Sequence, residues 1–476
     1  MKKFSHLLPF YIFLAFLTGI ILGHSSPLFW VFLIVCIPSV ALVIFFYKKQ
    51  RLLLSDIFII VFFISLGGLW VIPSAQHSRR IDSYLGKPGE YVIKVTSLPQ
   101  EQSKRNSFYA TVKAFNKRVR VNDYTRSLGY LGSYRLIAKV SKQQYKGKDF
   151  YSLWVKKDAK VEQLPQPFWD SYARKITDYI LSVFKNNLSE QGYRFMSSVL
   201  LGRREVLGEE KQILTNAGVA HLLALSGLHL GLISLFLFFT LRLFYLPFKQ
   251  CLVVSVLFLL FYTFLTGMAW STLRAALMYS FVAVGFFLKR RTNLLNSWGL
   301  AGLCTLIIDP LALFEAGFQL SYLAVFAIIV WFKMFPIKVF ANRFLNYAQG
   351  LFFCSFCVTL FLTPLISYYF GRIYLLSLFY NLVLIPVFAL ILAIGFLLVI
   401  FSTLGFAAHS LGSILSLGIA GFVFLSRLLS SFRLSYWEYR FSSYLVGAYY
   451  LLLAVSLITI WRHLESKRMI AQRAYQ

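Results

Sequence analysis

Long apolar runs occupy most of the chain, and one polar stretch, residues 74–170, interrupts them. A bilayer core about 30 Å thick needs about 20 apolar residues for each spanning helix, and roughly a dozen segments meet this requirement. Three of them open the chain, near residues 8–23, 28–47 and 52–72. The pattern predicts a polytopic α-helical membrane protein.

Inside the polar stretch the apolar residues recur with period two, which is typical of strands that have one buried face. Five such runs occupy residues 91–96, 107–114, 118–121, 133–140 and 150–155. Five short strands separated by Gly-rich or polar turns favour a small barrel of the OB-fold kind. The fold class that we expect is therefore a polytopic helical membrane protein with an inserted OB-like β-barrel domain.

Basic residues in the short loops orient the helices, because cytoplasmic loops carry an excess of Lys and Arg. Lys2 and Lys3 precede the first helix, and three more basic residues lie within residues 48–51. Both clusters are expected in the cytoplasm, so the third helix delivers the barrel to the outer face of the cell inner membrane. The later loops agree, and both termini are then cytoplasmic, if the segment near residue 213 is a re-entrant half-span.

Shifts in composition set the expected domain boundaries. We expect transmembrane helices over residues 1–73, the extracytoplasmic OB-like domain over 74–167, an amphipathic interfacial helix over 168–195, a second transmembrane domain over 196–461 and a cytoplasmic tail over 462–476. The basic start of the chain has the form of a signal peptide, but a second apolar run follows without a small-residue cleavage site. The first helix is therefore expected to be retained.

The charge balance of the chain points to a polyanionic partner. Lys and Arg number 48 against 18 Asp and Glu, a formal net charge of +30. Residues 79–162 alone hold 19 Lys and Arg against 7 Asp and Glu. An exterior domain longer than about 60 residues escapes the positive-inside constraint, so this charge is free to serve binding. Anionic lipid headgroups are the alternative partner.

Aromatic and basic residues are interleaved along the predicted barrel strands. This combination suits single-stranded nucleic acid, because bases stack on rings while cations follow the phosphates. The candidate DNA-binding cations are Lys113, Lys117, Arg118, Arg120 and Arg135. The aromatic residues are Phe108, Tyr109, Phe115, Tyr134, Phe150, Tyr151 and Trp154. The alternative is that aromatic residues alternating along strands form the barrel core.

Polar residues interrupt several of the later apolar segments. Polar groups at membrane depth need partners or water, so they tend to line a cavity. The polar residues concerned are His221, Ser226, His229, Arg274, Asp309, Gln319 and Asn381. Each histidine has the alternative of a buried structural role, and Arg274 has the alternative of reaching the membrane surface. Proline and glycine near these positions favour interrupted helices whose ends point into a pore or an interface.

Four sequence blocks carry these residues: AHLLALSGLHLGL, TGMAWSTLRAAL, DPLALFEAGFQLSYLAV, and LTPL followed by FYNLVLIP. In this order they resemble the competence domain of ComEC-type DNA-uptake channels, over about residues 195–400. The resemblance implies transport of single-stranded transforming DNA across the cytoplasmic membrane during natural competence. By position it points to the seven polar residues named above as the channel-core residues. It also implies a ComEA-like extracytoplasmic DNA receptor and a cytoplasmic DNA translocase or single-strand-binding protein as partners.

The sequence departs from longer members of that family, which continue into a metallo-β-lactamase-like domain proposed to degrade the excluded strand. Here the sequence ends shortly after its last apolar segment, and no His and Asp cluster has metal-ligand spacing. No GxxxxGK[ST] loop for a nucleotide is present. We therefore expect no metal, no cofactor and no enzymatic activity, and a separate nuclease if one is needed.

Two other functions fit parts of the sequence. Ser226 between His221 and His229 offers a nucleophile and a base for intramembrane proteolysis, but no orienting acid is evident. A polytopic transporter of a small anion or a lipid-linked substrate would also use exterior basic charge and interrupted helices. The second of these remains the alternative to a DNA channel.

Overall fold

A computed structural model gives the conformation of most of the 476-residue chain. It describes residues 7–25, 29–48, 52–86, 88–96, 100–101, 106–114, 117–145, 148–203, 206–223, 225–268, 270–288, 293–336, 340–432 and 435–474. Lys2, Lys3, Phe115 and residues 49–51, which entered the predictions above, lie outside these ranges.

The chain divides into two compact units. The first unit comprises Met1–Gly208, Leu222–Leu313 and Ile391–Ala420, and the second comprises Glu209–His221, Phe314–Leu390 and Gly421–Gln476. Nine helices within the described residues are long and apolar enough to span a membrane, and three shorter apolar helices accompany them. This set agrees with the expected multi-pass helical membrane protein.

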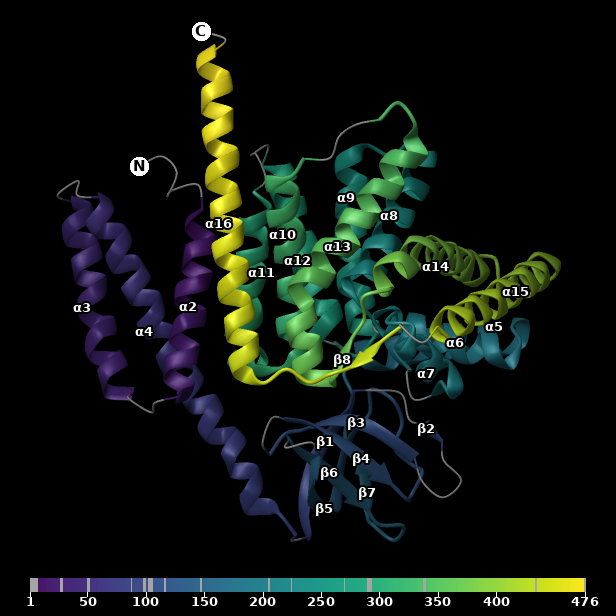
Figure 1. Ribbon diagram of the computed structural model, residues 1–476. Helices are drawn as coiled ribbons and strands as arrows, with labels where there is room; N and C mark the ends of the chain where they lie inside the picture. Colours follow the sequence, from purple (N-terminus) through teal and green to yellow (C-terminus); the bar gives the residue numbers. More distant parts are fainter. Residues whose placement is uncertain are drawn as a thin grey trace. The chain divides into compact units, whose positions relative to one another are not determined.

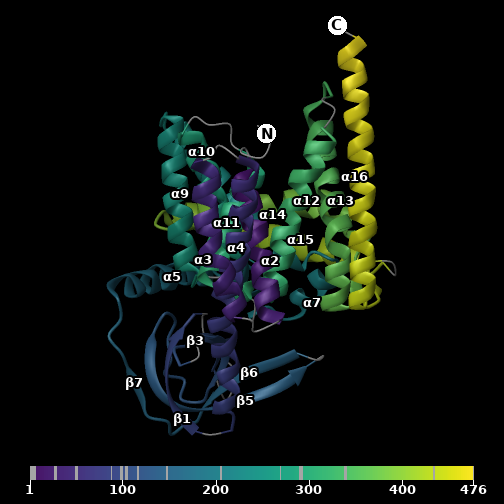
Figure 2. The same ribbon diagram turned by 90° about the vertical axis from the view of Figure 1, so that its left-hand side faces the viewer.

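The first unit begins with three helices, α2 (Leu8–Ser25), α3 (Phe29–Lys48) and α4 (Leu52–Arg79), which lie side by side in Figures 1 and 2. Small residues let α2 and α4 approach closely, because a Cβ added to Gly19 would lie 1.9 Å from the Ile64 carbonyl oxygen. Phe13 of α2 packs edge-on against Trp298 with ring centroids 5.0 Å apart. The opening helices are thus joined to α11 (Leu294–Ile308), almost 300 residues further along the chain.

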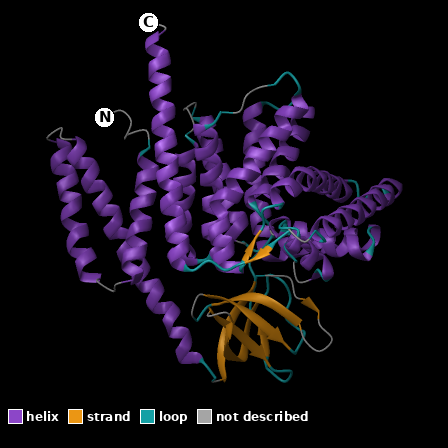
Figure 3. Cartoon of the chain, viewed as in Figure 1, coloured by secondary structure: helices purple, strands orange, loops and turns teal. Residues whose placement is uncertain are grey.

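The polar stretch folds as a small β-barrel, drawn in orange in Figure 3. Its strands are β1 (Pro88–Val95), β2 (Gln100–Glu101), β3 (Asn106–Val112), β4 (Lys117–Asp123), β5 (Ser133–Tyr145), β6 (Lys148–Val155) and β7 (Val161–Gln163). The main order is β1-β3-β4-β6-β5, and the pairing of β1 with β5 closes the barrel. Strands β4 and β6 run parallel, and the other pairs run antiparallel. All five predicted strands are confirmed.

The alternation along the strands sends one set of side chains into the barrel. Phe108 and Tyr134 are 2% and 3% exposed and belong to this core, so the expectation that they stack on nucleic-acid bases is wrong for these two. The period-two pattern that identifies the strands also buries every second residue. Tyr109, one position beyond Phe108, points outward and is 39% exposed. The side chain of Phe150 lies outside the described set.

Polar contacts attach the barrel to the helices of the first unit. The Lys94 ammonium is 2.8 Å from the carboxylate of Asp170, which is buried at the start of α5 (Phe168–Asn187). The Tyr130 hydroxyl donates to the Leu265 carbonyl at the end of α9 (Phe248–Leu265), at 2.7 Å. Arg174 of α5 donates to the Tyr130 carbonyl at 2.8 Å. One barrel loop is therefore held by two helices.

The expected single helix over residues 168–195 is wrong in extent. The structure has two helices, α5 and α6 (Glu190–Leu201), separated at Leu188 and Ser189. The Ser189 side chain accepts a hydrogen bond from the Gly192 N–H and so caps a new helix. The start of α5 exposes Phe168, Trp169 and Tyr172, as expected of an amphipathic helix.

Four further helices of the first unit are α8 (Gly227–Leu243), α9, α10 (Trp270–Phe287) and α11 (Leu294–Ile308). The segment near residue 213 is α7 (Glu209–Asn216), which belongs to the second unit and begins with two glutamates. Eight residues rise about 12 Å along a helix axis, too little to cross a bilayer core. Its re-entrant placement stays a prediction.

The second unit is built from α12 (Ala316–Met334), α13 (Arg343–Phe370), α16 (Ser443–Ala474) and parts of α14 (Ser377–Ile400) and α15 (Gly405–Ser430). Helices α12, α13 and α16 lie side by side in both views (Figures 1 and 2). The Tyr449 and Tyr450 hydroxyls of α16 each donate to a backbone carbonyl of α13 at 2.9 Å. A two-residue pairing of β8 (Arg372–Ile373) with β9 (Trp437–Glu438) joins the loops that follow α13 and α15.

We expect Gly267→Ala to destabilise the junction between barrel and helices. Gly267 has φ of +75°, and an added Cβ would lie 2.3 Å from the Thr96 carbonyl oxygen. Gly86→Ala is the matched control, because Gly86 has φ of +77° and no described atom within 4 Å of the added Cβ. Both variants bear the left-handed backbone cost of about 1–2 kcal/mol, and Gly267→Ala bears the clash in addition. Equal apparent melting temperatures of the two purified variants would contradict this.

Candidate functional site

A serine and a histidine are hydrogen-bonded at the start of α8. Ser226 is the N-cap residue, and its Oγ lies 2.9 Å from Nδ1 of His229 in the first turn. His229 is completely buried. A buried imidazole held by a hydroxyl has a fixed ring orientation, so this pair presents a defined polar group inside an otherwise apolar helix.

Arg274 lies inside the helical bundle rather than at its surface. It is in the second turn of α10 and only 3% exposed, so the alternative that it reaches the membrane surface does not hold. A Cβ added to Gly227 would lie 3.8 Å from the Ala275 Cβ, which places the start of α8 against this part of α10. A buried arginine in an apolar helix is costly, and such residues are usually kept for function.

Asp309 has a local structural role. It ends α11, and its Oδ1 accepts a hydrogen bond from the Leu311 N–H at 3.0 Å, inside the short 3₁₀ helix Pro310–Phe314. This geometry is an Asx turn, in which a short polar side chain replaces a missing backbone partner. The Asp-Pro sequence is thus explained as a helix stop.

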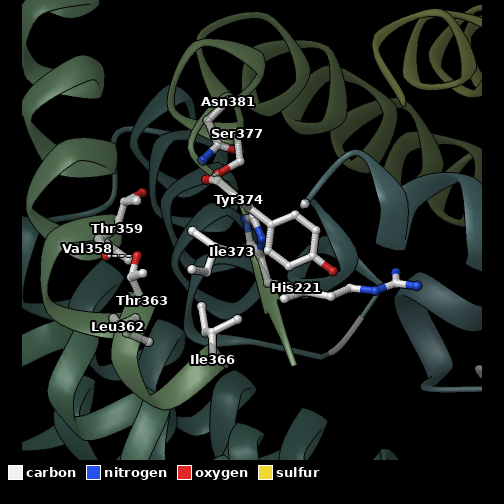
Figure 4. A pocket seen from close by; sticks show the side chains of 12 residues that line it. His221, Val358, Thr359, Leu362, Thr363, Ile366, Ile373, Tyr374, Ser377 and Asn381 are labelled. Atoms are coloured by element: carbon white, nitrogen blue, oxygen red, sulfur yellow. Dashed lines mark hydrogen bonds between the residues drawn. The ribbon is translucent and has the colours of Figure 1, made fainter. Parts of the chain in front are cut away.

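The second unit contains a cavity that brings two of the predicted channel-core residues together (Figure 4). Its volume is about 80 Å³. It is lined by Gly218, His221, Val358, Thr359, Leu362, Thr363, Ile366, Arg372, Ile373, Tyr374, Ser377 and Asn381. His221 and Asn381 are 160 residues apart in sequence and share this cavity. Gln319 is not among its lining residues; its Oε1 accepts a hydrogen bond from the Tyr369 hydroxyl at 2.8 Å and joins α12 to α13.

Arg372 supplies the positive charge at the cavity and was not among the predicted site residues. Its Nη1 donates to Asn216 Oδ1 at 3.0 Å, and its Nη2 is 3.5 Å from Glu438 Oε1. The guanidinium carbon also lies 4.6 Å from the centre of the Tyr436 ring. The sequence offered one signal for this residue, an arginine directly after the α13 C-cap Gly371. Its partners Asn216 and Glu438 come from distant segments of the chain.

The ionisation states around the cavity follow from burial and neighbouring charge. Burial acts to lower the pKa of Arg372, but the hydrogen bond with Tyr374 and the charge of Glu438 help to raise that pKa above its ordinary value. Burial raises the pKa of Tyr374, against the opposing effect of Arg372. His221 keeps part of its surface accessible, yet desolvation by the surrounding protein lowers its pKa to about 4. At neutral pH the cavity therefore has a cationic guanidinium, a neutral phenol and a neutral imidazole.

The predicted DNA-binding cations occupy different settings on the barrel. Lys113 and Arg120 are exposed, and Arg120 pairs across the strands with Tyr109. Arg135 lies between two carboxylates, 3.4 Å from Glu90 and 3.2 Å from Glu162. Lys117 and Arg118 lie on β4, opposite Val112 and Thr111 of β3.

The structure thus separates the predicted channel-core residues. Ser226, His229, Arg274 and Asp309 belong to the first unit, and His221, Gln319 and Asn381 belong to the second. Among the described residues, no group of three or more His, Cys, Asp or Glu side chains has the geometry to hold a metal ion.

We expect Asp309→Asn to preserve stability and Asp309→Ala to lower it by about 1 kcal/mol, because asparagine can still accept the turn hydrogen bond and alanine cannot. Thermal unfolding of the purified full-length protein measures both. If Asp309→Asn is as damaging as Asp309→Ala, the carboxylate charge itself is required and the Asx-turn explanation is insufficient.

Comparison with known proteins places this arrangement in a family. ComE operon protein 3 of Bacillus subtilis (strain 168) is 30% identical over 212 residues, 44% of this chain and 26% of that protein. Recombination protein 2 of Haemophilus influenzae is 29% identical over 252 residues, 50% of this chain and 32% of that protein. The chain therefore aligns with a third or less of the length of these two relatives. No solved structure matches the chain.

A sequence model described as "Competence protein" matches residues 199–463, which include the Ser226 and His229 pair, Arg274 and the second-unit cavity. This range is more than half of the chain, and the resemblance seen in the four sequence blocks is confirmed. The chain belongs to the competence protein family of the ComEC type.

Proposed function

We propose that this protein is a channel for single-stranded transforming DNA across the cytoplasmic membrane during natural competence. Membership of the competence family implies involvement in DNA uptake. The observation that carries the proposal is the burial of Arg274 and His229 within apolar helices of the matched region. A hydrophobic bundle retains such groups where a polar or charged solute must pass.

Passage of a strand requires contacts that are numerous and individually weak. A phosphate held tightly at one site cannot move to the next, so conduction needs several sites of moderate strength. Arg274 would compensate phosphate charge, and the oriented Ser226 and His229 pair would offer hydrogen bonds. These roles depend on charge and shape rather than on base identity, as transport of any sequence demands.

We further propose that the OB-like barrel lies on the extracytoplasmic side and collects the strand. Its outer face presents Tyr109 and Arg120 as cross-strand neighbours, with Lys113 exposed nearby in the chain. Exposed Phe168 and Trp169 at the start of α5 suit the membrane–water interface, where aromatic side chains gather. Both termini would then be cytoplasmic.

The proposed cycle needs other proteins. A ComEA-like receptor would capture duplex DNA outside the cell, and a cytoplasmic translocase or single-strand-binding protein would draw the strand inward. Degradation of the second strand, where it occurs, is assigned to a separate nuclease.

Natural transformation of a deletion strain tests the channel directly. We expect Arg274→Ala to reduce transformation at least tenfold at normal protein level, because a strand entering a low-dielectric bundle loses its buried counter-charge. Fluorescent DNA should then accumulate outside the cytoplasm. Arg427→Ala is the matched control, because the Arg427 side chain is 63% exposed and paired with Glu209.

Normal transformation by the deletion strain would refute the channel and favour a transporter of a small anion or lipid-linked substrate. Normal transformation by Arg274→Ala alone would remove that residue from the path and leave the channel standing.

We expect Arg120→Gln to weaken binding of single-stranded DNA more than Arg135→Gln. Arg120 is exposed beside Tyr109, whereas the charge of Arg135 is already offset by Glu90 and Glu162. Because one phosphate contact is lost, the negative slope of log K against log salt should become less steep by about 0.7 for Arg120→Gln. Equal slopes for both variants and wild type would show that this face of the barrel does not bind DNA.

A further inference from the structure

The cavity of the second unit contains a buried polar group that the protein does not satisfy. Asn381, in the first turns of α14, is 9% exposed and lines the cavity (Figure 4). Its Oδ1 has no hydrogen-bond partner among the described residues. Buried side-chain oxygens without partners are uncommon and usually indicate water, an ion or a ligand. The Asn381 amide therefore has hydrogen-bonding capacity beside this cavity that the described residues do not use.

Hydroxyl groups on both walls of the cavity already form hydrogen bonds within the protein. Figure 4 shows residues of α13, including Thr359 and Thr363, on one side, and Tyr374, Ser377 and Asn381 on the other. The Thr363 hydroxyl is already committed to the Thr359 carbonyl, and the Ser377 hydroxyl to the Tyr374 carbonyl. Hydroxyl hydrogens in these two pairs are therefore used within the protein. Among the other lining residues, Asn381 has a buried amide oxygen without a described partner, and Arg372 brings a positive charge.

The turn at Gly218 packs tightly against the start of α14 at one wall of the cavity. Gly218, in the turn after α7, has φ of +75°, and an added Cβ would lie 2.9 Å from both the Ser377 Cβ and the Tyr374 ring. Only glycine allows this turn to approach the start of α14 so closely. The cavity is thus formed by three chain segments that are brought into contact by the fold.

Arg372 is held in place with donors to spare. A guanidinium has five N–H donors, and the described contacts engage Asn216, Glu438 and Tyr374. At least one donor therefore remains for another acceptor. The contact with Glu438 is 3.5 Å long, and that glutamate side chain is 70% exposed, so this pair is weak and readily exchanged.

We propose that this cavity is a phosphodiester-binding subsite on the path of the strand, with Arg372 and Asn381 as the residues that hold the phosphate. This inference rests on the proposed channel function and adds to it one specific binding site for the strand. A phosphate oxygen would accept from the Asn381 amide nitrogen, and the positive charge of Arg372 would compensate the charge of the phosphate. Because no described protein group fixes the orientation of that amide, it is free to turn its nitrogen toward an anion.

Size and chemistry favour phosphate over a base or a cation. A water needs about 10–15 Å³ of such space, so the cavity holds on the order of five waters, comparable with one phosphodiester group. A base would be read by its edges, which a sequence-independent channel must avoid. A cation would meet the positive charge of Arg372. The guanidinium suits a phosphate because hydrogen bonds between two charged groups are stronger than those between neutral groups.

Binding by the full-length protein in lipid nanodiscs tests the subsite. The probe is an oligothymidylate of about 16 nucleotides, compared with a methylphosphonate oligomer of the same length that lacks backbone charge. The slope of log K against log salt is negative. We expect Arg372→Gln to make it less steep by about 0.7, the value for one phosphate contact. Arg440→Gln is the matched control, because Arg440 is exposed in the same unit, donates to the Tyr368 carbonyl and does not line the cavity. It should leave the slope unchanged.

Two further substitutions change affinity in opposite directions. Asn381→Asp places a negative charge in the cavity with almost no change in shape, and we expect about tenfold weaker binding of the charged oligomer. Glu438→Gln removes the carboxylate that competes for Arg372, and we expect several-fold tighter binding. A cation site would reverse the first result, with tighter binding of a divalent cation to Asn381→Asp.

The subsite is refuted if Asn381→Asp binds the charged oligomer as tightly as wild type, or if Arg372→Gln and Arg440→Gln have the same salt slope. Should Asn381→Asp fail to fold, the Arg372→Gln slope and the Glu438→Gln affinity decide the matter. Failure of the channel itself has a different signature: a deletion strain that transforms normally. If wild type imports DNA normally and all cavity variants bind the oligomer as wild type does, the subsite is refuted and the channel function stands.

Discussion

Lipid offers no hydrogen-bond partners, so every polar group inside the helical parts of this protein must find one within the protein or in a water-filled space. The structure meets this constraint repeatedly with side chains that donate to backbone carbonyls of neighbouring helices. Tyr262 of α9 donates to the Leu200 carbonyl of α6, and Tyr449 and Tyr450 of α16 donate to carbonyls of α13. Such bonds fix the helices against one another without adding charge.

The candidate functional residues are buried polar groups that do not bond to the backbone of a neighbouring helix in this way. Ser226 and His229 are hydrogen-bonded to each other within one helical turn, which fixes the orientation of an imidazole at a buried position. Asn381 keeps an oxygen without a described partner beside a cavity. An apolar residue would fill either position at lower free-energy cost, so these polar groups are candidates for function rather than for packing.

The barrel obeys a different rule, because its strands have one buried face and one face that carries polar and charged residues. Its strands alternate, so one set of residues builds a core around Phe108 and Tyr134 while the other set, including Tyr109 and Arg120, faces outward. The contacts of Lys94 with Asp170 and of Tyr130 with Leu265 then attach the barrel to helices. The same alternation that stabilises the barrel thus decides which aromatic and basic residues lie on its outer face.

The sequence by itself determined the apolar segments, the five strands and the family, because hydrophobic length, period-two alternation and the four blocks are local properties of the chain. It also identified His221 and Asn381, as polar residues in apolar surroundings. Only the tertiary structure decided that these two share a cavity with Arg372, since the partners Asn216 and Glu438 come from segments far away in the chain. Tertiary structure likewise gave Asp309 a capping role, because a hydrogen bond to a particular backbone N–H is a matter of geometry that composition cannot encode.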